Sequence, residues 1–317
     1  MDLATELSQL GHSIRVLTLT PAREPDAFSF EVVRKPGFWQ TVRHIRWADA
    51  FVQFNISLKG ILPYLFVQNP LVLTHHNLYP ATSLTGRLKW AVSRRATVNM
   101  GCSKFIAQHY RNCYTLSNPY NDTVFIGQTN KQRSKELVFL GRLVSDKGVS
   151  VLLQSLAKLR QRTDLMPTLT IIGDGPERSL LEKQVHDLGL HQQVQFAGVL
   201  QGKTLVEELN QSQILLIPSV YEEPFGIVAL EGIACGCFVI GSKAGGLPEA
   251  IGPCGVTFPM EDSDALADLL AKALQEPEWV EMYRQQARHH LEQHTRPIVA
   301  ARFLTIIEEA VWKKKNY

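Results

Sequence analysis

The stretch ILLIPSVYEEPFGIVALEGIACGCFVIGS, residues 214–242, contains a strand, a helix and a second strand in succession. Its first six residues, ILLIPS, are almost all apolar, which is typical of a strand that is covered on both faces. A Pro-Phe-Gly turn leads into FGIVALEGIACG, which has helical spacing and ends at a glycine. The run that follows, CFVIGS, is apolar again. The stretch therefore predicts two parallel strands joined by a helix, which is the repeating unit of an α/β fold.

The same alternation of strands and helices continues on both sides of this unit. In the second half of the chain, strands are predicted at ELVFLGRL (136–143), TLTIIGDG (168–175) and QVQFAG (193–198). Helices are predicted there at 148–162, 177–190, 204–212 and 263–275, and in the tail. In the first half, helices are predicted at 2–12, 83–96 and 103–110, and strands at 13–20, 47–54, 70–77 and 97–103. The pattern predicts two Rossmann-like domains in tandem, with a ligand at the carboxyl ends of the strands.

A polar stretch, GQTNKQRSKE (127–136), separates the two series and is predicted to be the linker. The predicted domains are therefore 1–128 and 129–317. A chain of 317 residues is long enough for two domains of ordinary size.

Composition narrows the class of protein. Hydrophobic residues make up 45% and charged residues 20%, as in a soluble globular protein. The net charge of +3 is too small to indicate a nucleic-acid partner, but it suits anionic ligands or an anionic membrane surface. The opening residues are polar and do not resemble a signal peptide, and the most apolar stretch, 60–74, is interrupted by prolines. We therefore expect a cytoplasmic protein.

The cysteines have no disulfide or metal spacing and are predicted to be reduced thiols: Cys102, Cys113, Cys235, Cys237 and Cys254.

Two loops carry candidate phosphate ligands. In FLGRLVSDKG (139–148), Arg142 and Lys147 follow a predicted strand, where Arg supplies a planar fork for phosphate oxygens and Lys a point charge. The alternative is a pair of solvated charges in a surface turn. In PFGIVALE (224–231), a helix is predicted to begin near Phe225 or Gly226, so that its first amides and its dipole favour an anion.

Two glutamates, Glu223 and Glu231, flank this predicted helix start. With a phosphate at the helix start, their carboxylates are placed to accept hydrogen bonds from ligand hydroxyls on either side of it. The alternatives are that Glu223 complements the helix dipole and that Glu231 lies on a solvated helix face.

Several segments together resemble the signature of glycosyltransferase family 4, of the "glycosyl transferases group 1" type. They are GRLVSDKG (141–148), IIGDGPE (171–177), VQFAG (194–198), EPFGIVALE (223–231) and AGGLPE (244–249), in the family's order. The resemblance covers the second domain from about Glu136 to the C-terminus. It implies a retaining enzyme with the GT-B fold, in which two Rossmann-like domains with parallel sheets face a cleft. It also implies that a hexosyl group is transferred from a nucleotide-diphospho-sugar to a glycan, lipid-linked or small-molecule acceptor, as in polysaccharide biosynthesis.

The resemblance implies a role for each matching residue. Arg142 and Lys147 would hold the diphosphate and stabilise the charge on the leaving nucleotide, Glu231 would bind the ribose, and Glu223 would contact the donor sugar. Because these cations and the helix amides supply the positive charge, no metal and no cofactor are expected. The implied donor-binding set is Gly141, Arg142, Lys147, Gly173, Phe196, Gly198, Glu223, Phe225, Gly226, Ile227 and Glu231, with the base near Phe196 and Gly198. The implied catalytic set is His76, Glu223, Arg142 and Lys147.

His76 enters this set because it follows the strand LVLTHHN (71–77) at the position of a family histidine that lies beside the donor sugar. A structural or surface histidine is the alternative. The family's last helix returns to the first domain, and the same is expected here at about 297–315. That helix ends in the cluster Lys313–Lys315, so a peripheral contact with the inner face of a membrane is an open alternative.

Other polar clusters are predicted to be structural. Asp262 and Asp264 precede a helix and are predicted to cap its N-terminus rather than bind a metal. His290 and His294 are spaced i, i+4 in the tail and are predicted to be solvent-face residues.

The first domain departs from the family pattern. Members usually open with a strand and a Gly-Gly loop, whereas this chain begins at the helix that follows them. The first predicted domain is therefore expected to lack its usual first strand. Either the start is internal to a longer chain, or the protein is a shortened relative. The alternative functions are a catalytically weak or inactive nucleotide-sugar-binding protein and a GT-B nucleotide-sugar epimerase.

Overall fold

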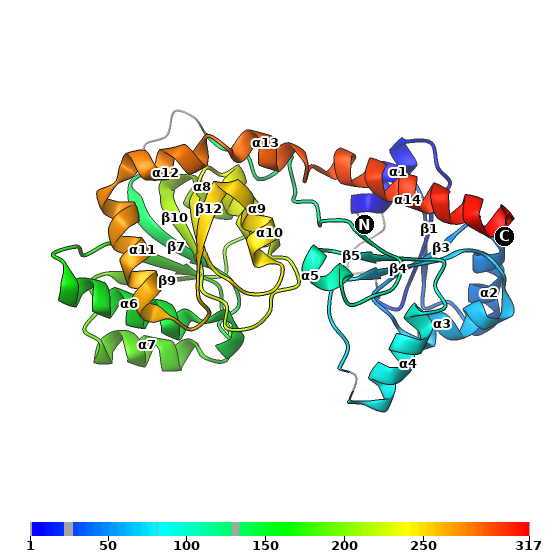
Figure 1. Ribbon diagram of the computed structural model, residues 1–317, viewed down its shortest axis with the longest axis horizontal. Helices are drawn as coiled ribbons and strands as arrows, with labels where there is room; N and C mark the ends of the chain where they lie inside the picture. The colour runs from blue at the N-terminus through cyan, green and yellow to red at the C-terminus, as the bar shows by residue number, and fades with distance from the viewer. Residues whose placement is uncertain (1, 22–27, 81, 129–132, 317) are drawn as a thin grey trace. The chain divides into compact units, whose positions relative to one another are not determined.

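The computed structural model describes residues 2–21, 28–80, 82–128 and 133–316. The chain divides into two compact units (Figure 1). Unit 1 consists of Met1–Asn118 and Arg296–Tyr317, and unit 2 consists of Pro119–Thr295. The chain thus leaves unit 1 once and returns to it for its last segment.

Unit 1 contains two parallel sheets. The larger has the order β3-β4-β5-β6, and the smaller pairs β1 with β2. Residues of β4 and β5 are buried throughout, whereas all four residues of β1 are only partly buried. The strands are β1 (Arg15–Thr18), β2 (Glu31–Arg34), β3 (Phe51–Phe54), β4 (Leu71–His75), β5 (Val98–Gly101) and β6 (Cys113–Thr115).

The helices of unit 1 complete one core together with the end of the chain. The long helix α14 packs against α1 and β4, and Phe303 and Ala310 of α14 join Leu7, Val72 and Met100 in this core. Three short helices begin with Ser57, Ser83 and Ser103 as N-caps, each of whose hydroxyls accepts a bond from an amide three residues on. The helices are α1 (Asp2–Gln9), α2 (Phe38–Trp47), α3 (Leu58–Ile61), η1 (Leu62–Phe66), α4 (Leu84–Ser93), α5 (Lys104–Ala107) and α14 (Arg296–Asn316).

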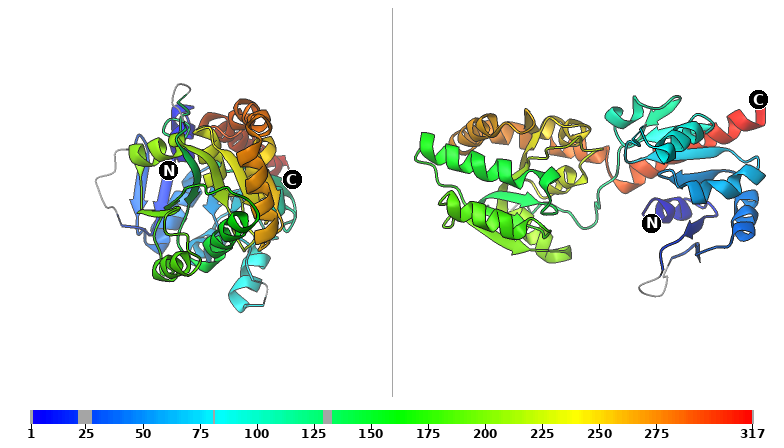
Figure 2. Two further views of the ribbon diagram at one scale, coloured as in Figure 1. Left: turned by 90° about the vertical axis from the view of Figure 1, so that its left-hand side faces the viewer. Right: turned by 90° about the horizontal axis from the view of Figure 1, so that it is seen from below.

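Unit 2 contains one parallel sheet of six strands in the order β12-β11-β10-β7-β8-β9. The contacts group helix α6 with α7 and α11, and α9 with α10, and the strands lie between helices in Figures 1 and 2. The strands are β7 (Lys135–Leu140), β8 (Leu169–Ile172), β9 (Val194–Gly198), β10 (Ser212–Ile217), β11 (Phe238–Ser242) and β12 (Gly255–Phe258).

The helices of unit 2 follow the strands in a doubly wound arrangement. Their inner faces bury a core that includes Phe139, Leu152, Leu216, Phe238 and Leu270. The helices are η2 (Ser145–Lys147), α6 (Val149–Arg162), α7 (Arg178–Asp187), α8 (Gly202–Gln211), α9 (Ile227–Ala234), α10 (Leu247–Ile251), η3 (Gly252–Cys254), α11 (Ser263–Gln275), α12 (Pro277–Arg284) and α13 (Ala287–Glu292).

Every strand predicted from the sequence is present, and so are the predicted helices, although the one at 103–110 is reduced to α5. The sequence patterns did not predict β2, β6, β12 or α10, which have at most five residues each. They also missed α2, although it has ten residues and its buried positions have helical spacing. Part of the predicted linker, residues 129–132, lies outside the described residues. Its end at Lys135 and Glu136 belongs to β7, and the boundary between the units lies at Asn118 and Pro119.

No helix in the described part of the chain combines the length and the apolarity that are needed to cross a bilayer.

Candidate functional site

The strand order of unit 2 has a reversal between β7 and β10. The chain runs outward from β7 to β8 and β9, then returns to β10 and continues to β11 and β12 on the other side. The loops that follow β7 and β10 therefore start at adjacent strand ends and lead to opposite sides of the sheet. Doubly wound sheets bind ligands at such a place. Gly148 has a positive φ of 69°, and a Cβ there would overlap the carbonyl oxygen of Pro218, so these loops touch. Most of the predicted site residues lie on these two loops or on helix α9.

Lys147 and Glu223 meet at this reversal. Lys147 Nζ donates to Glu223 Oε1 over 2.7 Å, and the Glu223 side chain is almost fully buried. The sequence placed the two residues at different ends of the donor, Lys147 on the diphosphate and Glu223 on the sugar. The structure shows them as one ion pair between the two loops.

Two residues that the sequence analysis did not single out hold the Glu223 carboxylate. Ser219 Oγ donates to Glu223 Oε1 over 2.7 Å, and the Tyr221 hydroxyl donates to Oε2 over 2.5 Å. The Tyr221 hydroxyl also lies 3.2 Å from Lys147 Nζ. Burial, followed by the interaction with Glu223, raises the pKa of Tyr221 and keeps its hydroxyl protonated. The only sequence signal for these residues is that hydroxyls precede Glu223 at every second position.

Helix α9 begins directly after the Glu223 loop. Its N-cap is Gly226, whose φ of 106° suits glycine, and a Cβ there would come within 2.7 Å of the Leu247 side chain. Phe225 places its side chain in the core, so only its backbone is available to a ligand. The helix begins at Ile227, and Ala229 N donates to the carbonyl oxygen of the N-cap Gly226 over 3.0 Å. The amides before it, of Ile227 and Val228, lie at the position where helices bind anions.

Glu231 lies in the second turn of α9. It is partly buried, and its carboxylate has no hydrogen bond or ion pair with any described residue. Burial raises the pKa of Glu231 to about 7. This environment disagrees with the alternative of a freely solvated helix face, and it leaves both carboxylate oxygens ready to accept hydrogen bonds from a ligand.

Arg142 lies at the end of β7, and its side chain is exposed. It makes no ion pair with any described residue. The backbone on either side is fixed, because Leu143 N donates to Asp174 O over 3.0 Å and Gly141 N donates to Ile172 O over 3.0 Å. A rigid backbone therefore presents a cation that has no partner within the described part of the protein.

Three of the predicted glycines meet at neighbouring strand ends. Gly173 has a φ of 137°, and a Cβ there would overlap the carbonyl oxygen of Gly141. Gly173 N also donates to Gly198 O over 2.8 Å, next to a β-bulge that shifts the register of β8 and β9. Phe196 on β9 is half-buried, with the Arg178 guanidinium 5.9 Å from its ring centre.

His76 belongs to unit 1, whereas the other predicted site residues belong to unit 2. Its Nε2 is buried and has no partner among the described residues. Burial lowers the pKa of His76, and a hydrogen bond with Asn118 partly opposes this effect. The neighbouring His75 is fully buried, with its Nε2 2.8 Å from Asn99 Oδ1, and burial lowers its pKa to about 4. His75 is therefore a core residue.

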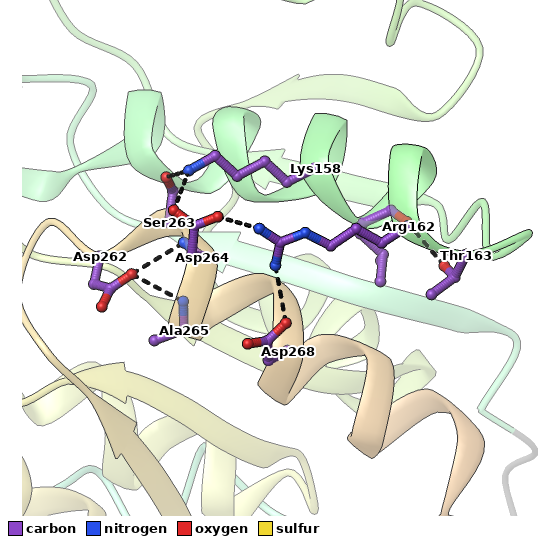
Figure 3. Close-up of polar contacts among 9 residues, drawn as sticks. Lys158, Arg162, Thr163, Asp262, Ser263, Asp264, Ala265 and Asp268 are labelled. Atoms are coloured by element: carbon purple, nitrogen blue, oxygen red, sulfur yellow. Dashed lines mark hydrogen bonds and ion pairs between the residues drawn. The ribbon is translucent and has the colours of Figure 1, made fainter.

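In the acidic cluster at the start of α11, Asp262 has the predicted capping role, whereas Asp264 pairs with helix α6 instead. Figure 3 shows Asp262 Oδ1 accepting bonds from the amides of Asp264 and Ala265, at 3.1 and 2.9 Å, which caps the helix. Asp264 pairs with Lys158 over 2.5 Å and with Arg162, both on α6. Within the described residues, no group of three or more His, Cys, Asp or Glu side chains is arranged to hold a metal ion.

The prediction for His290 and His294 is wrong. His294 is buried, and His290 Nε2 lies 2.9 Å from the carbonyl oxygen of Ala250 at the end of α10. The two rings are 4.8 Å apart, and the His294 ring lies 5.7 Å from that of Phe225. These histidines pack the tail against the α9 and α10 region, which the i, i+4 spacing alone did not indicate.

The fold matches solved glycosyltransferase structures. A glycosyltransferase from Rickettsia africae aligns over 100% of this chain and 94% of its own, with a TM-score of 0.84 and 17% identity. Anabaena HepE in complex with UDP aligns over 93% of this chain and 100% of its own, with a TM-score of 0.77 and 16% identity. These neighbours and the two Rossmann-like units confirm the predicted GT-B fold.

Sequence comparison then assigns the family. The model for "Glycosyl transferases group 1" matches residues 122–290, and the chain belongs to this family. An uncharacterised glycosyltransferase of Methanocaldococcus jannaschii is 41% identical over 117 residues, which are 37% of this chain and 29% of that protein. Glycogen synthase of Mycobacterium tuberculosis is 35% identical over 158 residues, which are 49% of this chain and 38% of that protein. The chain thus spans less than half the length of these curated relatives.

Proposed function

We propose that this protein is a retaining glycosyltransferase of family 4 that moves a sugar from a nucleotide-diphospho-sugar to a glycan, lipid-linked or small-molecule acceptor. The observation that carries the proposal is the grouping of two cations and two carboxylates around the strand reversal of unit 2. Lys147 and Glu223 form a preset pair there, and Arg142 and Glu231 have no partner among the described residues. The presence of UDP, and of UDP-glucose, in structures of Anabaena HepE supports a nucleotide-sugar donor.

Each side chain has a role that its chemistry supports. Cleavage of the sugar–phosphate bond leaves negative charge on the diphosphate, which Arg142, Lys147 and the first amides of α9 would stabilise. This positive charge comes from the protein, which is the basis for proposing a reaction without a metal. Glu231 would accept hydrogen bonds from the ribose hydroxyls. The base would lie near Phe196, and His76 of unit 1 would lie beside the donor sugar.

The Lys147–Glu223 pair can bind a donor without separating. An ammonium has three N–H donors, and Lys147 uses two of them, on Glu223 and Tyr221. A carboxylate has about four acceptor positions, and Glu223 uses three, with Lys147, Ser219 and Tyr221. One N–H for a phosphate oxygen and one lone pair for a sugar hydroxyl remain. The pair would therefore hold phosphate and sugar at a fixed separation.

The proposed setting is the cytoplasm, where the five free cysteines would remain reduced. The contacts of Lys313 within unit 1 give little support for a membrane contact at the C-terminal lysine cluster. Lys313 Nζ lies 3.1 Å from the Tyr114 hydroxyl and 3.9 Å from a Glu309 oxygen, both within unit 1. The side chain of Lys315 lies outside the described residues.

The test measures release of nucleotide and transfer of sugar from a panel of UDP-, GDP- and ADP-sugars, with acceptor mixtures. We expect Arg142→Ala and Glu231→Ala each to lower the rate with the preferred donor by about 100-fold or more, because each removes an interaction with the charged donor. The matched controls are Arg288→Ala and Glu278→Ala, which remove exposed charges from α13 and α12. These controls should retain the wild-type rate.

Three outcomes are distinguishable. Tight nucleotide binding with no turnover of any donor would instead identify a nucleotide-sugar-binding protein. Conversion of the nucleotide-sugar into its epimer, without transfer, would identify an epimerase. Loss of activity in the two control variants as well would show that the effect is not specific to the site.

A further inference from the structure

Unit 1 has an exposed aromatic cluster that no element of the described chain covers. Phe38 and Trp39 at the start of α2 and Phe66 at the end of η1 have ring centres 5.2 to 5.7 Å apart. Their exposed fractions are 41%, 69% and 53%. Leu62 and Leu65, one turn apart on η1, are 51% and 64% exposed. Phe38, Trp39 and Phe66 contact one another, and exposed apolar side chains that gather in this way indicate a binding site.

Basic side chains adjoin the aromatic cluster. Trp39, Arg43 and Arg46 follow one another at helical spacing on α2, whose buried residues are Thr41, Val42 and Ile45. Arg46 Nη2 donates to the carbonyl oxygen of Phe66 over 3.2 Å, which joins the charged stripe to the aromatic cluster. We call Phe38, Trp39, Arg43, Arg46, Lys59, Leu62, Leu65 and Phe66 the aromatic–basic surface.

These cations are not neutralised locally. Arg43, Arg46 and Lys59 are exposed and make no ion pair with any described residue. The sequence from 32 to 118 contains 11 Lys and Arg residues and a single acidic residue, Asp49. Over whole units, unit 1 carries 18 basic and 8 acidic residues, and unit 2 carries 15 and 22, so their net charges of +10 and −7 add to the chain's +3. The small net charge of the chain therefore conceals a strongly basic unit.

We propose that the aromatic–basic surface binds the headgroup region of an anionic lipid bilayer. Trp and Phe side chains favour the boundary between headgroups and acyl chains, and Arg and Lys are attracted to anionic headgroups. The surface offers both kinds of group on α2, on η1 and on α3, the short helix that directly precedes η1. It differs in place from the C-terminal lysine cluster, where the neighbouring rings are Tyr114, over which Lys313 lies, and the exposed Trp312. This binding does not depend on the proposed transferase activity.

A soluble polyanion fits the surface less well. Such a ligand needs the charges but gains little from the exposed leucines and phenylalanines, whereas a bilayer removes these side chains from water. The two partners therefore predict different responses to loss of the apolar residues alone.

The experiment sediments the full chain with sonicated vesicles, either of phosphatidylcholine or of phosphatidylcholine with 30 mol% phosphatidylglycerol. The phosphatidylglycerol gives the second kind of vesicle a negative surface charge. We expect the protein to sediment with the anionic vesicles and not with the neutral ones. Arg43→Gln combined with Arg46→Gln should weaken this binding about 25-fold, at about fivefold per charge. Trp39→Ser combined with Phe66→Ser should weaken it about tenfold or more without changing the charge.

Two controls make the result specific. Leu180→Ser removes a side chain that is 63% exposed on α7 of unit 2, and Lys314→Gln removes a charge from the C-terminal cluster. Both should bind vesicles like the wild type. All substituted side chains are exposed, and far-UV circular dichroism with a thermal melt verifies the fold of each variant.

The proposal is overturned if the wild type fails to sediment with anionic vesicles, or if the Trp39 and Phe66 variant binds them as well as the wild type does. It is also overturned if dextran sulfate, used as a soluble polyanion, binds with the same dependence on Trp39 and Phe66. If Lys314→Gln alone removes binding, the contact belongs to the C-terminal cluster and not to this surface.

Discussion

Glu231 is a carboxylate held in an environment that disfavours its charge. It is partly buried, it has no hydrogen-bond partner among the described residues, and its pKa is raised from 4.5 to about 7. In the unfolded chain the same group has its ordinary pKa. Between these two values, the folded chain retains a proton that the unfolded chain has released, so this residue makes the protein less stable as pH rises.

We therefore expect Glu231→Gln to stabilise the protein at pH 8 and to leave its stability almost unchanged at pH 4. The gain is of the order of 3 kcal/mol, at about 1.4 kcal/mol for each pKa unit, and it develops between about pH 4.5 and 7. Urea denaturation of the wild type and the variant across this range measures the difference. Taking this difference removes the contributions of His75 and His76, which titrate in both proteins. Glu278→Gln on α12 is the control, and an equal pH-dependent gain there would contradict the assignment.

At the residue scale, the sequence predicted where the candidate residues gather better than it predicted their partners. The spacing of Glu223 and Glu231 and the positions of Arg142 and Lys147 located one end of the sheet in unit 2. The hydrogen bonds from Ser219 and Tyr221 to Glu223 arise from the path of a loop that has no periodic pattern. Contacts of this kind cannot be predicted from the spacing of residues along the sequence, because they depend on the path of the loop in space.

At the scale of elements, the glycines at the strand ends of unit 2 set how closely the loops approach. Gly173 has both a positive φ and no space for a side chain, because a Cβ would overlap Gly141. Gly198 on the adjacent strand also has a positive φ, of 72°, but nothing lies within 4 Å of the position of its Cβ. A substitution at Gly198 therefore measures the loss of stability from backbone strain alone. A substitution at Gly173 adds the loss from a steric clash.

We expect Gly198→Ala to cost about 1 kcal/mol of stability, from strain at positive φ alone. Gly173→Ala should cost about 3 kcal/mol or more, because the loop after β7 must also move. It should weaken nucleotide binding, since that loop carries Arg142. Denaturant unfolding and nucleotide titration measure the two effects. Equal losses in the two variants would show that the approach of Gly173 to Gly141 is not important.

The elements themselves were predicted where their patterns are long or strongly apolar. Buried strands such as β10 and amphipathic helices such as α6 and α11 fall into this class. The short strands β2 and β6 were not predicted, because neither lies in a longer apolar or alternating run, whereas the equally short β3 lies within the run WADAFVQF. Tertiary pairing with a neighbouring strand, rather than local preference, defines them.

At the scale of the whole molecule, the chain does not build its units in simple succession. Helix α14 follows unit 2 in sequence but completes the core of unit 1, where Phe303 is 2% exposed and its ring lies 6.1 Å from that of Phe54. Apolar spacing predicted a helix in the tail, and only the resemblance to a known family suggested its destination.

This connection predicts a remote effect of a substitution near the C-terminus. Phe303→Ala should destabilise unit 1 by about 3 to 5 kcal/mol, because it leaves a cavity in that core. Hydrogen exchange should then become faster for the amides of β4 and remain nearly unchanged for those of β10. Ile298→Ala, at a position that is 43% exposed on the same helix, is the control and should affect neither strand strongly. Equal acceleration in β4 and β10 would indicate that the units unfold as one.

The division of unit 1 into two small sheets affects how the protein behaves at high concentration. Among the described residues, β1 pairs only with β2, and β3 pairs only with β4, so each has a side whose backbone groups form no strand ladder. Such edges are templates for further strands, and β1 carries no proline that would prevent pairing. Where such an edge is open to solvent, an extended peptide or a second molecule can add a strand to it. The backbone of unit 1, as well as its charge, is therefore a feature to consider when the protein is concentrated.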